Sequence, residues 1–166
     1  MTLAPLLAAS PIIQIHADAA TLALLLGAAN LLRRRRDALH RALGRVWVGA
    51  MAVVALSSFG IRGFELVGPF GPLHLLSLWV LWSLWSGVRE ARAGRIEAHH
   101  ATFRSLYRYG LLVAGAATLL PGRRLNQVLF PEAPEAGYAV LAVIGAAVIW
   151  REISDRRAAG RKWSAL

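Results

Sequence analysis

The chain of 166 residues is strongly apolar: 57% of its residues are hydrophobic, 17% are charged, and the mean hydropathy is +0.49. This balance is typical of a membrane protein and excludes an ordinary soluble domain. The chain has no cysteine, which excludes disulfides, thiolate ligands and a cysteine nucleophile. The formal net charge is +10, but the basic residues fall between apolar runs, so we expect lipid and not nucleic acid as the partner.

Five apolar runs follow in chain order, and we interpret each as the centre of a membrane-crossing helix. They cover residues 12–32, 46–61, 73–88, 106–120 and 136–150. Because a span needs about 20 residues, the middle runs must extend into their polar flanks. No basic stretch precedes the first run, so we expect it to remain as a helix and not to be cleaved as a signal peptide. The sequence predicts an all-α integral membrane helix bundle, with residues 1–166 as a single domain.

Arginine and lysine predict the orientation of these helices. Residues 33–45 hold six of the 19 basic residues, and 89–108 and 151–162 hold five each, so sixteen lie on one side. The other three are Arg62, Arg123 and Arg124. The positive-inside rule then places the N-terminus outside and the C-terminus on the inner side of the cytoplasmic membrane.

Four of the five histidines lie at the ends of predicted helices, His16 and His74 on the outer side and His40 and His99 on the inner side. His16 and His40 are 24 positions apart, and His74 and His99 are 25 apart. This near-equality suggests that a hairpin at 12–61 was duplicated as 73–120, with 136–150 as an extra fifth helix. A pseudo-two-fold four-helix core would bring His16 opposite His74 and His40 opposite His99.

Small and aromatic side chains follow these histidines at helical spacing. Ala20, Ala23 and Gly27 follow His16, and such a stripe permits close backbone approach or leaves room for a flat ligand. Three further sets are Gly44, Trp47 and Met51 after His40; Phe103, Leu106 and Gly110 after His99; and Trp79, Trp82 and Trp85. Packing in the core or against lipid is the plainer interpretation of all these residues.

Histidine pairs across a helix bundle are the axial ligand set of six-coordinate haem. We therefore predict one or two b-type haems, held by His16 with His74, by His40 with His99, or by both pairs, for electron transfer within or across the bilayer. Zinc or copper generally requires three or four protein ligands. Beyond its two histidines, the outer side offers only Asp18, and the inner side offers only Asp37 and His100. We find no hydrolase or transferase motif and predict no catalytic residue.

Two other functions remain open. In the first, the chain is a structural or accessory subunit of a larger membrane complex, or a homo-oligomer, without a cofactor; its histidines cap helices and pair with acids. A small solute or metal transporter ranks below both, because the helices lack breaks and midplane charges.

Single polar residues have plain interpretations. We expect Asp18 to pair with His16 or Arg62, or to face water, and His100 to be solvated. The hydroxyls of Ser57, Ser58 and Ser77 are expected to bond to backbone carbonyls or to neighbouring helices.

Several blocks resemble an uncharacterised bacterial family of small predicted multi-helix membrane proteins, a domain of unknown function. They are "HADAATLALLLGAANLL", "LHRALGRVWV", "LSSFGIRGFELVGPFGPLHLLSL" and "AHHATFRSLYRYGLLVAGAATLLPGR", with a His-Arg-x-x-Gly-Arg block and a Leu-Leu-Pro-Gly-Arg block. The resemblance covers about residues 15–130. It implies that His16, His40, His74 and His99 occupy the family's histidine positions. Phe103, Arg62 and the fifth helix depart from the family pattern, and the resemblance implies no activity.

Overall fold

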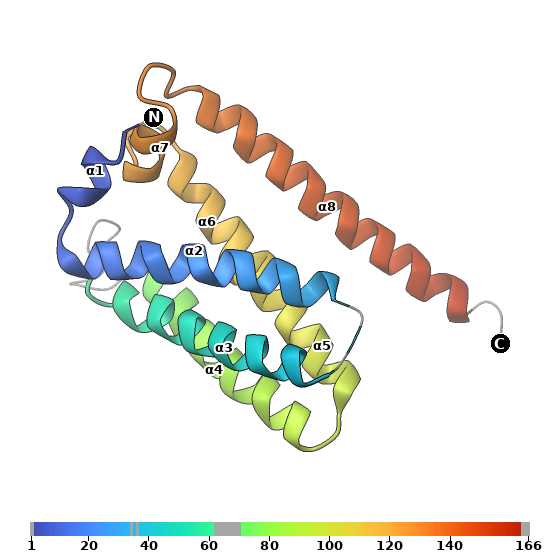
Figure 1. Cartoon of the computed structure of the whole chain (residues 1–166). Helices are drawn as coiled ribbons and strands as arrows, with labels where there is room; N and C mark the ends of the chain where they lie inside the picture. Colours follow the sequence, from blue (N-terminus) through green and yellow to red (C-terminus); the bar gives the residue numbers. More distant parts are fainter. Residues whose placement is uncertain (1, 34, 36, 62–70, 164–166) are drawn as a thin grey trace. The chain divides into compact units, whose positions relative to one another are not determined.

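The computed structural model describes residues 2–33, 35, 37–61 and 71–163, and within these residues the chain is helical without strands (Figure 1). The long helices are α2 (Pro11–Leu32), α3 (Ala38–Ser58), α4 (Pro72–Arg92), α5 (Ile96–Ser105) and α8 (Ala136–Trp163). The shorter elements are α1 (Ala4–Leu7), a π-helix η1 (Leu106–Val113), α6 (Ala114–Ala116), a 3-10 turn η2 (Ala117–Leu119) and α7 (Arg124–Leu129). The predicted all-α class is confirmed.

The chain divides into two compact units. Leu6–Leu112 form the first, called here the histidine unit because it holds every histidine, and Met1–Pro5 with Val113–Leu166 form the second, the C-terminal unit. The predicted first hairpin, 12–61, lies inside the histidine unit. The boundary between the units falls inside the predicted second hairpin, 73–120.

Apolar side chains of α2, α3, α4 and η1 form one buried cluster in the histidine unit. In this unit α2 packs on α3, α3 on α4, and α4 on α5. The cluster contains Ala23 of α2; Trp47, Ala50, Met51 and Ala55 of α3; Val80 and Leu84 of α4; and Leu106 and Leu111 of η1. Met51 and Leu106 have no exposed surface. The packing interpretation of the stripes after His40 and His99 is therefore confirmed for Trp47, Met51 and Leu106.

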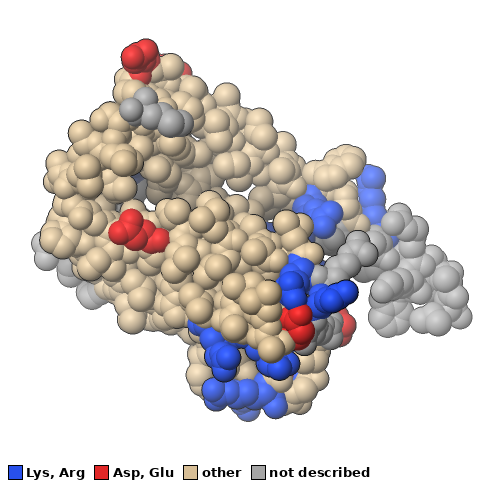
Figure 2. Space-filling model, viewed as in Figure 1, with Lys and Arg blue, Asp and Glu red and all other residues tan. Residues whose placement is uncertain are grey.

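The described arginines of the histidine unit lie mostly toward one end. They lie at the α2–α3 connection and around the α4–α5 turn, where Figure 2 shows a dense group of basic side chains. The described members are Arg33, Arg35, Arg41, Arg45, Arg89, Arg92, Arg95, Arg104 and Arg108. We call this the arginine end. At the opposite end, α3 finishes and α4 begins; we call it the hydroxyl end, after Ser57, Ser58 and Ser77.

The C-terminal unit is fixed by a buried asparagine. Asn126 of α7 is 1% exposed, and its Nδ2 donates to the carbonyls of Leu119 and Pro134 at 2.7 and 2.8 Å. These two bonds tie η2 and α7 to the loop before α8. Much of α8 is exposed, including Val143 and Trp150 at 68% and 71%. A helix with apolar side chains on its exposed faces suits lipid and not water.

Three described helices are long and apolar enough to cross a membrane: α2, α3 and the Ala136–Ser154 part of α8. The apolar runs located the centres of these helices, and the middle helices extend into their polar flanks as expected. The helix predicted at 46–61 begins at Ala38, because the Asp37 carboxylate accepts from the His40 amide and caps it. The helix predicted at 106–120 begins at Ile96, and the one predicted at 136–150 continues to Trp163. The sequence did not predict α1 or α7.

Candidate functional site

His16 joins α2 to α3 at the hydroxyl end. Its side chain is half-buried, and its Nδ1 lies 3.0 Å from the Ser57 hydroxyl oxygen. The Ser57 hydroxyl donates its own hydrogen to the carbonyls of Val53 and Val54, at 2.6 and 3.1 Å. With that hydrogen given to a carbonyl, the serine oxygen accepts from His16 Nδ1, and in this tautomer Nε2 keeps the lone pair of a neutral imidazole.

His74 has the opposite arrangement. It is the third residue of α4, and its Nδ1 accepts from the Gly71 amide at 3.1 Å. An amide can only donate, so a neutral His74 ring holds its proton on Nε2. The ring also lies against Phe59, with centroids 5.5 Å apart. His74 therefore caps the start of α4, as the cofactor-free interpretation expects, and its Nε2 has no lone pair for a metal.

The hydroxyls near these histidines behave as predicted. Ser58 donates to the Ala55 carbonyl at 2.7 Å, and Ser77 donates to the Leu73 carbonyl at 2.8 Å. Ser58 and Ser77 are also hydrogen-bonded to each other, which links α3 to α4. The expected bonding of serine to backbone and to neighbouring helices is confirmed.

His99 lies at the arginine end in a ligand-competent form. Its Nδ1 is 3.0 Å from the Gly87 carbonyl oxygen of α4. A carbonyl can only accept, so Nδ1 carries a proton, and in the neutral ring Nε2 then has the lone pair. The ring packs on Phe103, with centroids 4.6 Å apart, and Phe103 in turn packs on Trp47 at 5.3 Å. His100 lies beside it at 5.4 Å; it is half-buried within α5, so the expectation of a solvated loop residue is wrong.

His40 is held at the same end through its backbone. Its amide donates to Asp37, and its carbonyl accepts from Asn30 Nδ2 at 3.4 Å. The side-chain oxygen of Asn30 is buried and has no hydrogen-bond partner among the described residues. A buried acceptor without a partner is costly, and here it lies beside a predicted ligand.

The space beside the small residues of α2 is filled. Trp47 Nε1 donates to the Ala23 carbonyl at 2.8 Å, and the Tyr107 hydroxyl donates to the Leu24 carbonyl at 3.2 Å. A Cβ added to Gly27 would lie 2.5 Å from the Tyr107 ring and 2.6 Å from Trp47. The alternative that this stripe leaves room for a flat ligand is therefore wrong at Gly27, because two aromatic side chains of α3 and η1 occupy that position.

Charge at the arginine end is only partly balanced. Asp37 pairs with Arg33, which together with the His40 amide lowers the pKa of Asp37 to about 2. Glu90 pairs with Arg95, and this hydrogen bond lowers the pKa of the Glu90 carboxyl. No group of three or more histidine and carboxylate side chains suited to a metal ion occurs among the described residues.

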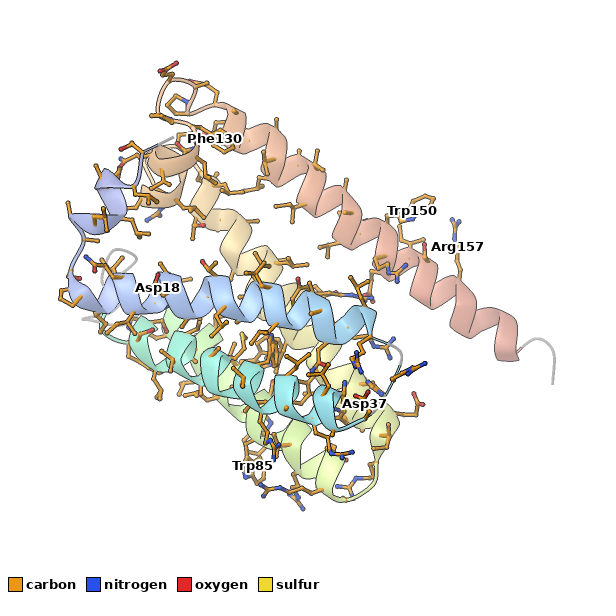
Figure 3. All side chains as sticks on the ribbon, viewed as in Figure 1. Asp18, Asp37, Trp85, Phe130, Trp150 and Arg157 are labelled. Carbon is orange, nitrogen blue, oxygen red and sulfur yellow. The ribbon has the colours of Figure 1, made fainter. Side chains whose placement is uncertain are left out.

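Asp18 is exposed on α2 (Figure 3) and forms no ion pair with a described residue. Its predicted alternative partner, Arg62, lies outside the described residues.

The sequence analysis missed Asn30, and it missed the hydroxyls of Ser83, Thr102 and Ser105, which line a hollow between α4 and α5. Their spacing indicates a shared helix face, since Trp79 and Ser83 are four residues apart and Thr102 and Ser105 are three apart.

A family model described as predicted membrane protein (DUF2306) matches residues 13–153. The match includes most of α8, so the expectation that the fifth helix is an addition to the family is wrong. No curated protein and no solved structure matches the chain. Since the matched region covers most of the sequence, the chain belongs to this family of predicted membrane proteins of unknown function, DUF2306.

Proposed function

We propose that the chain is a membrane b-type haem protein that passes electrons within or across the bilayer, with its site at the arginine end. His99 and His40 are the axial ligands in this proposal. The observation that carries it is the bond from His99 Nδ1 to the Gly87 carbonyl. A histidine whose second nitrogen is fixed to a backbone carbonyl presents Nε2 in one orientation, as metal-ligating histidines do.

Two neighbours support the choice of this end. The partnerless oxygen of Asn30 beside His40 is an acceptor that could fix the other ring N–H of a ligating His40. Phe103 and Trp47 give the His99 ring apolar surroundings, which shield a redox centre from water. When bound, haem would supply a reversible one-electron couple.

The hydroxyl end fits haem less well. His16 has a free lone pair on Nε2, but His74 would have to give up the cap of α4 and change its protonated nitrogen. We therefore assign no haem to His16 with His74. Following the positive-inside rule, we also propose that the arginine end faces the cytoplasm.

An absorption spectrum tests the proposal. Protein expressed with added haem and purified in detergent is expected to show a Soret band. The band is expected to be lost in His99→Ala and in His40→Ala and kept in His100→Ala, the matched control from the next residue. Absence of the band from the unmodified protein, or its loss only in His74→Ala, would overturn this assignment.

A cofactor-free structural or accessory subunit is the second candidate function. Two observations favour it. His74, a predicted ligand, caps a helix, and the position at Gly27 where a flat ligand was an alternative is filled by side chains. In that case His74→Ala weakens the fold, and no variant or unmodified preparation carries pigment.

A further inference from the structure

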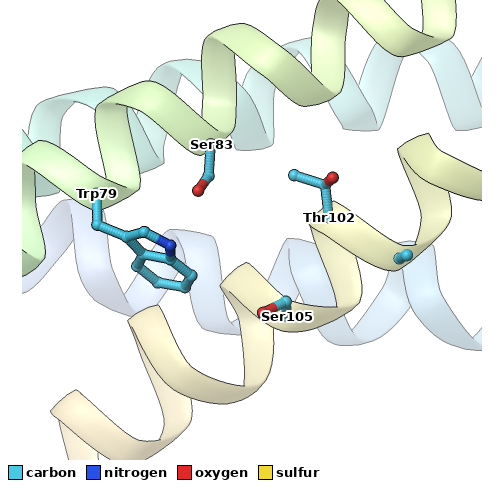
Figure 4. Close-up of a pocket in the computed structure, with 5 residues that line it drawn as sticks. Trp79, Ser83, Thr102 and Ser105 are labelled. Carbon is cyan, nitrogen blue, oxygen red and sulfur yellow. The ribbon is translucent and has the colours of Figure 1, made fainter.

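A hollow of about 320 Å³ lies between α4 and α5, within the histidine unit. Trp79 and Ser83 line it from α4, and Ala101, Thr102 and Ser105 line it from α5 (Figure 4). The hollow is partly open to the outside of the unit. Its volume is at the small end of the range for ligand pockets, enough for one ring or one polar headgroup.

Four polar groups of this hollow have no hydrogen-bond partner among the described residues. Within the described ranges, the Trp79 indole N–H and the hydroxyls of Ser83, Thr102 and Ser105 form no hydrogen bond with another residue. Ser83 is nevertheless only 7% exposed. Ser77, almost two turns earlier on α4, bonds both to the Leu73 carbonyl and to Ser58. In a lipid environment polar groups without partners are costly, so an occupant that bonds to them is favoured.

Two glycines set the walls of the hollow. A Cβ on Gly87 would collide with the Phe103 ring and lie 3.2 Å from Thr102 Cγ2. A Cβ on Gly110 would lie 3.4 Å from the Trp79 ring. Because these close contacts hold α4 near α5 and η1, the polar groups keep fixed positions around the hollow.

The lining determines the chemistry of the occupant. It contains no charged side chain and no histidine, so it offers nothing to neutralise an ion. An indole N–H can only donate, and the three hydroxyls can donate as well, so the occupant must bring an acceptor oxygen. The Trp79 ring and Ala101 add an apolar surface. An uncharged molecule with a carbonyl group and an apolar tail matches these requirements.

We propose that the α4–α5 hollow binds an uncharged carbonyl group of a lipid-soluble molecule, whose oxygen accepts hydrogen bonds from Trp79, Ser83 and Thr102 while its tail leaves through the open side. The carbonyl belongs either to the ester of a membrane glycerolipid or to the ring of a benzoquinone. This inference does not depend on haem and stands on the residues of the hollow alone.

Quenching of tryptophan fluorescence tests the site. The protein is placed in nanodiscs of ether-linked phosphatidylcholine, which has no carbonyl, and titrated with a decyl-substituted benzoquinone. We expect saturable quenching, with a saturable part that disappears in Trp79→Phe. The double variant Ser83→Ala, Thr102→Val should raise the half-saturating concentration about tenfold or more. Ser86→Ala, on α4 outside the hollow, is the matched control and should behave as the unmodified protein.

The two carbonyl sources are separated by the lipid. Replacing the ether lipid with its ester analogue raises the half-saturating concentration if ester carbonyls occupy the hollow, and leaves it unchanged if the site prefers a quinone ring. The proposal is overturned if quenching in the unmodified protein does not saturate. It is also overturned if the double variant and Ser86→Ala have the same half-saturating concentration while their thermal stability is unchanged. It is also overturned if the double variant changes the oligomeric mass, since a second copy would then cover the hollow.

Discussion

The two ends of the histidine unit place their histidines in different chemical settings. At the hydroxyl end, His74 accepts a backbone amide and Ser57, Ser58 and Ser77 use their hydroxyls on carbonyls and on neighbouring helices. At the arginine end, His99 donates to a carbonyl, and the side-chain oxygen of Asn30 has no partner in the part of the chain that the structure describes. Histidines near helix ends are therefore not chemically equivalent. The atom to which Nδ1 bonds decides whether Nε2 can bind a metal.

The largest contrast expected between the ends is their side of the membrane. The chain has no cysteine, so single cysteines report position without background. Ser10→Cys, before α2, should react with a membrane-impermeant maleimide in intact spheroplasts. Ala93→Cys, at the end of α4, should react only after permeabilisation. The reverse pattern, or equal labelling, would show that the arginine end does not face the cytoplasm.

In the buried region between the two ends, one added methyl group should lower the free energy of unfolding. In Gly27→Ala the new Cβ would meet Tyr107 and Trp47 at 2.5 and 2.6 Å. We expect a loss of about 1–3 kcal/mol in the free energy of unfolding, measured with denaturant in detergent. Gly49→Ala, with no atom within 4 Å of its added Cβ, should instead gain up to about 1 kcal/mol through helix propensity. Equal effects at both glycines would contradict this packing.

Removing the cap at the hydroxyl end should have a smaller effect. His74→Ala leaves the Gly71 amide without its side-chain acceptor, and we expect a loss of about 1 kcal/mol in unfolding free energy. His74→Gln should restore most of it, because a glutamine at this position reaches the same amide. If alanine and glutamine variants are equally unstable, the imidazole of His74 does something other than capping.

The smallest effect concerns acid pH at the arginine end. The pKa of Asp37 is lowered to about 2, chiefly by its hydrogen bond with Arg33. A lowered folded-state pKa means that the stabilisation is complete above the unfolded value near 4 and disappears as pH falls through about 2. The melting temperature of the unmodified protein should exceed that of Asp37→Asn at pH 5 and approach it near pH 2. A constant difference across this range would exclude the ionised Asp37 as its source.

Apolar runs predicted where helices lie, but capping and tertiary packing decided where they begin and end. The first run gave α2 to within one residue, because a helix surrounded by lipid is apolar on all faces. The helix expected to open near His99 begins three residues earlier, at Ile96, and its polar first turns are held by His99 and Phe103 packing near Gly87. The α8 extension past Trp150 contains charged residues that still favour helix.

For the candidate site, the sequence predicted which histidines lie near helix ends but not what each ring nitrogen bonds. His74 and His99 look alike in the sequence, yet one accepts from Gly71 and the other donates to Gly87. Neither partner is a side chain, so no residue pattern encodes the difference. The hollow between α4 and α5 likewise depends on the approach of two helices and not on a motif.

The π-helix from Leu106 to Val113 ends where the histidine unit ends, at the Leu112–Val113 boundary. Each of its backbone bonds encloses about one residue more than an α-helical bond does. Removing one residue from this stretch would let the backbone return to α-helical bonding and would rotate every later side chain by about 100° around the axis. A change of one residue in the length of this segment would therefore change the direction in which Ala116 and Leu119 point. The core residues of the preceding helices would stay the same.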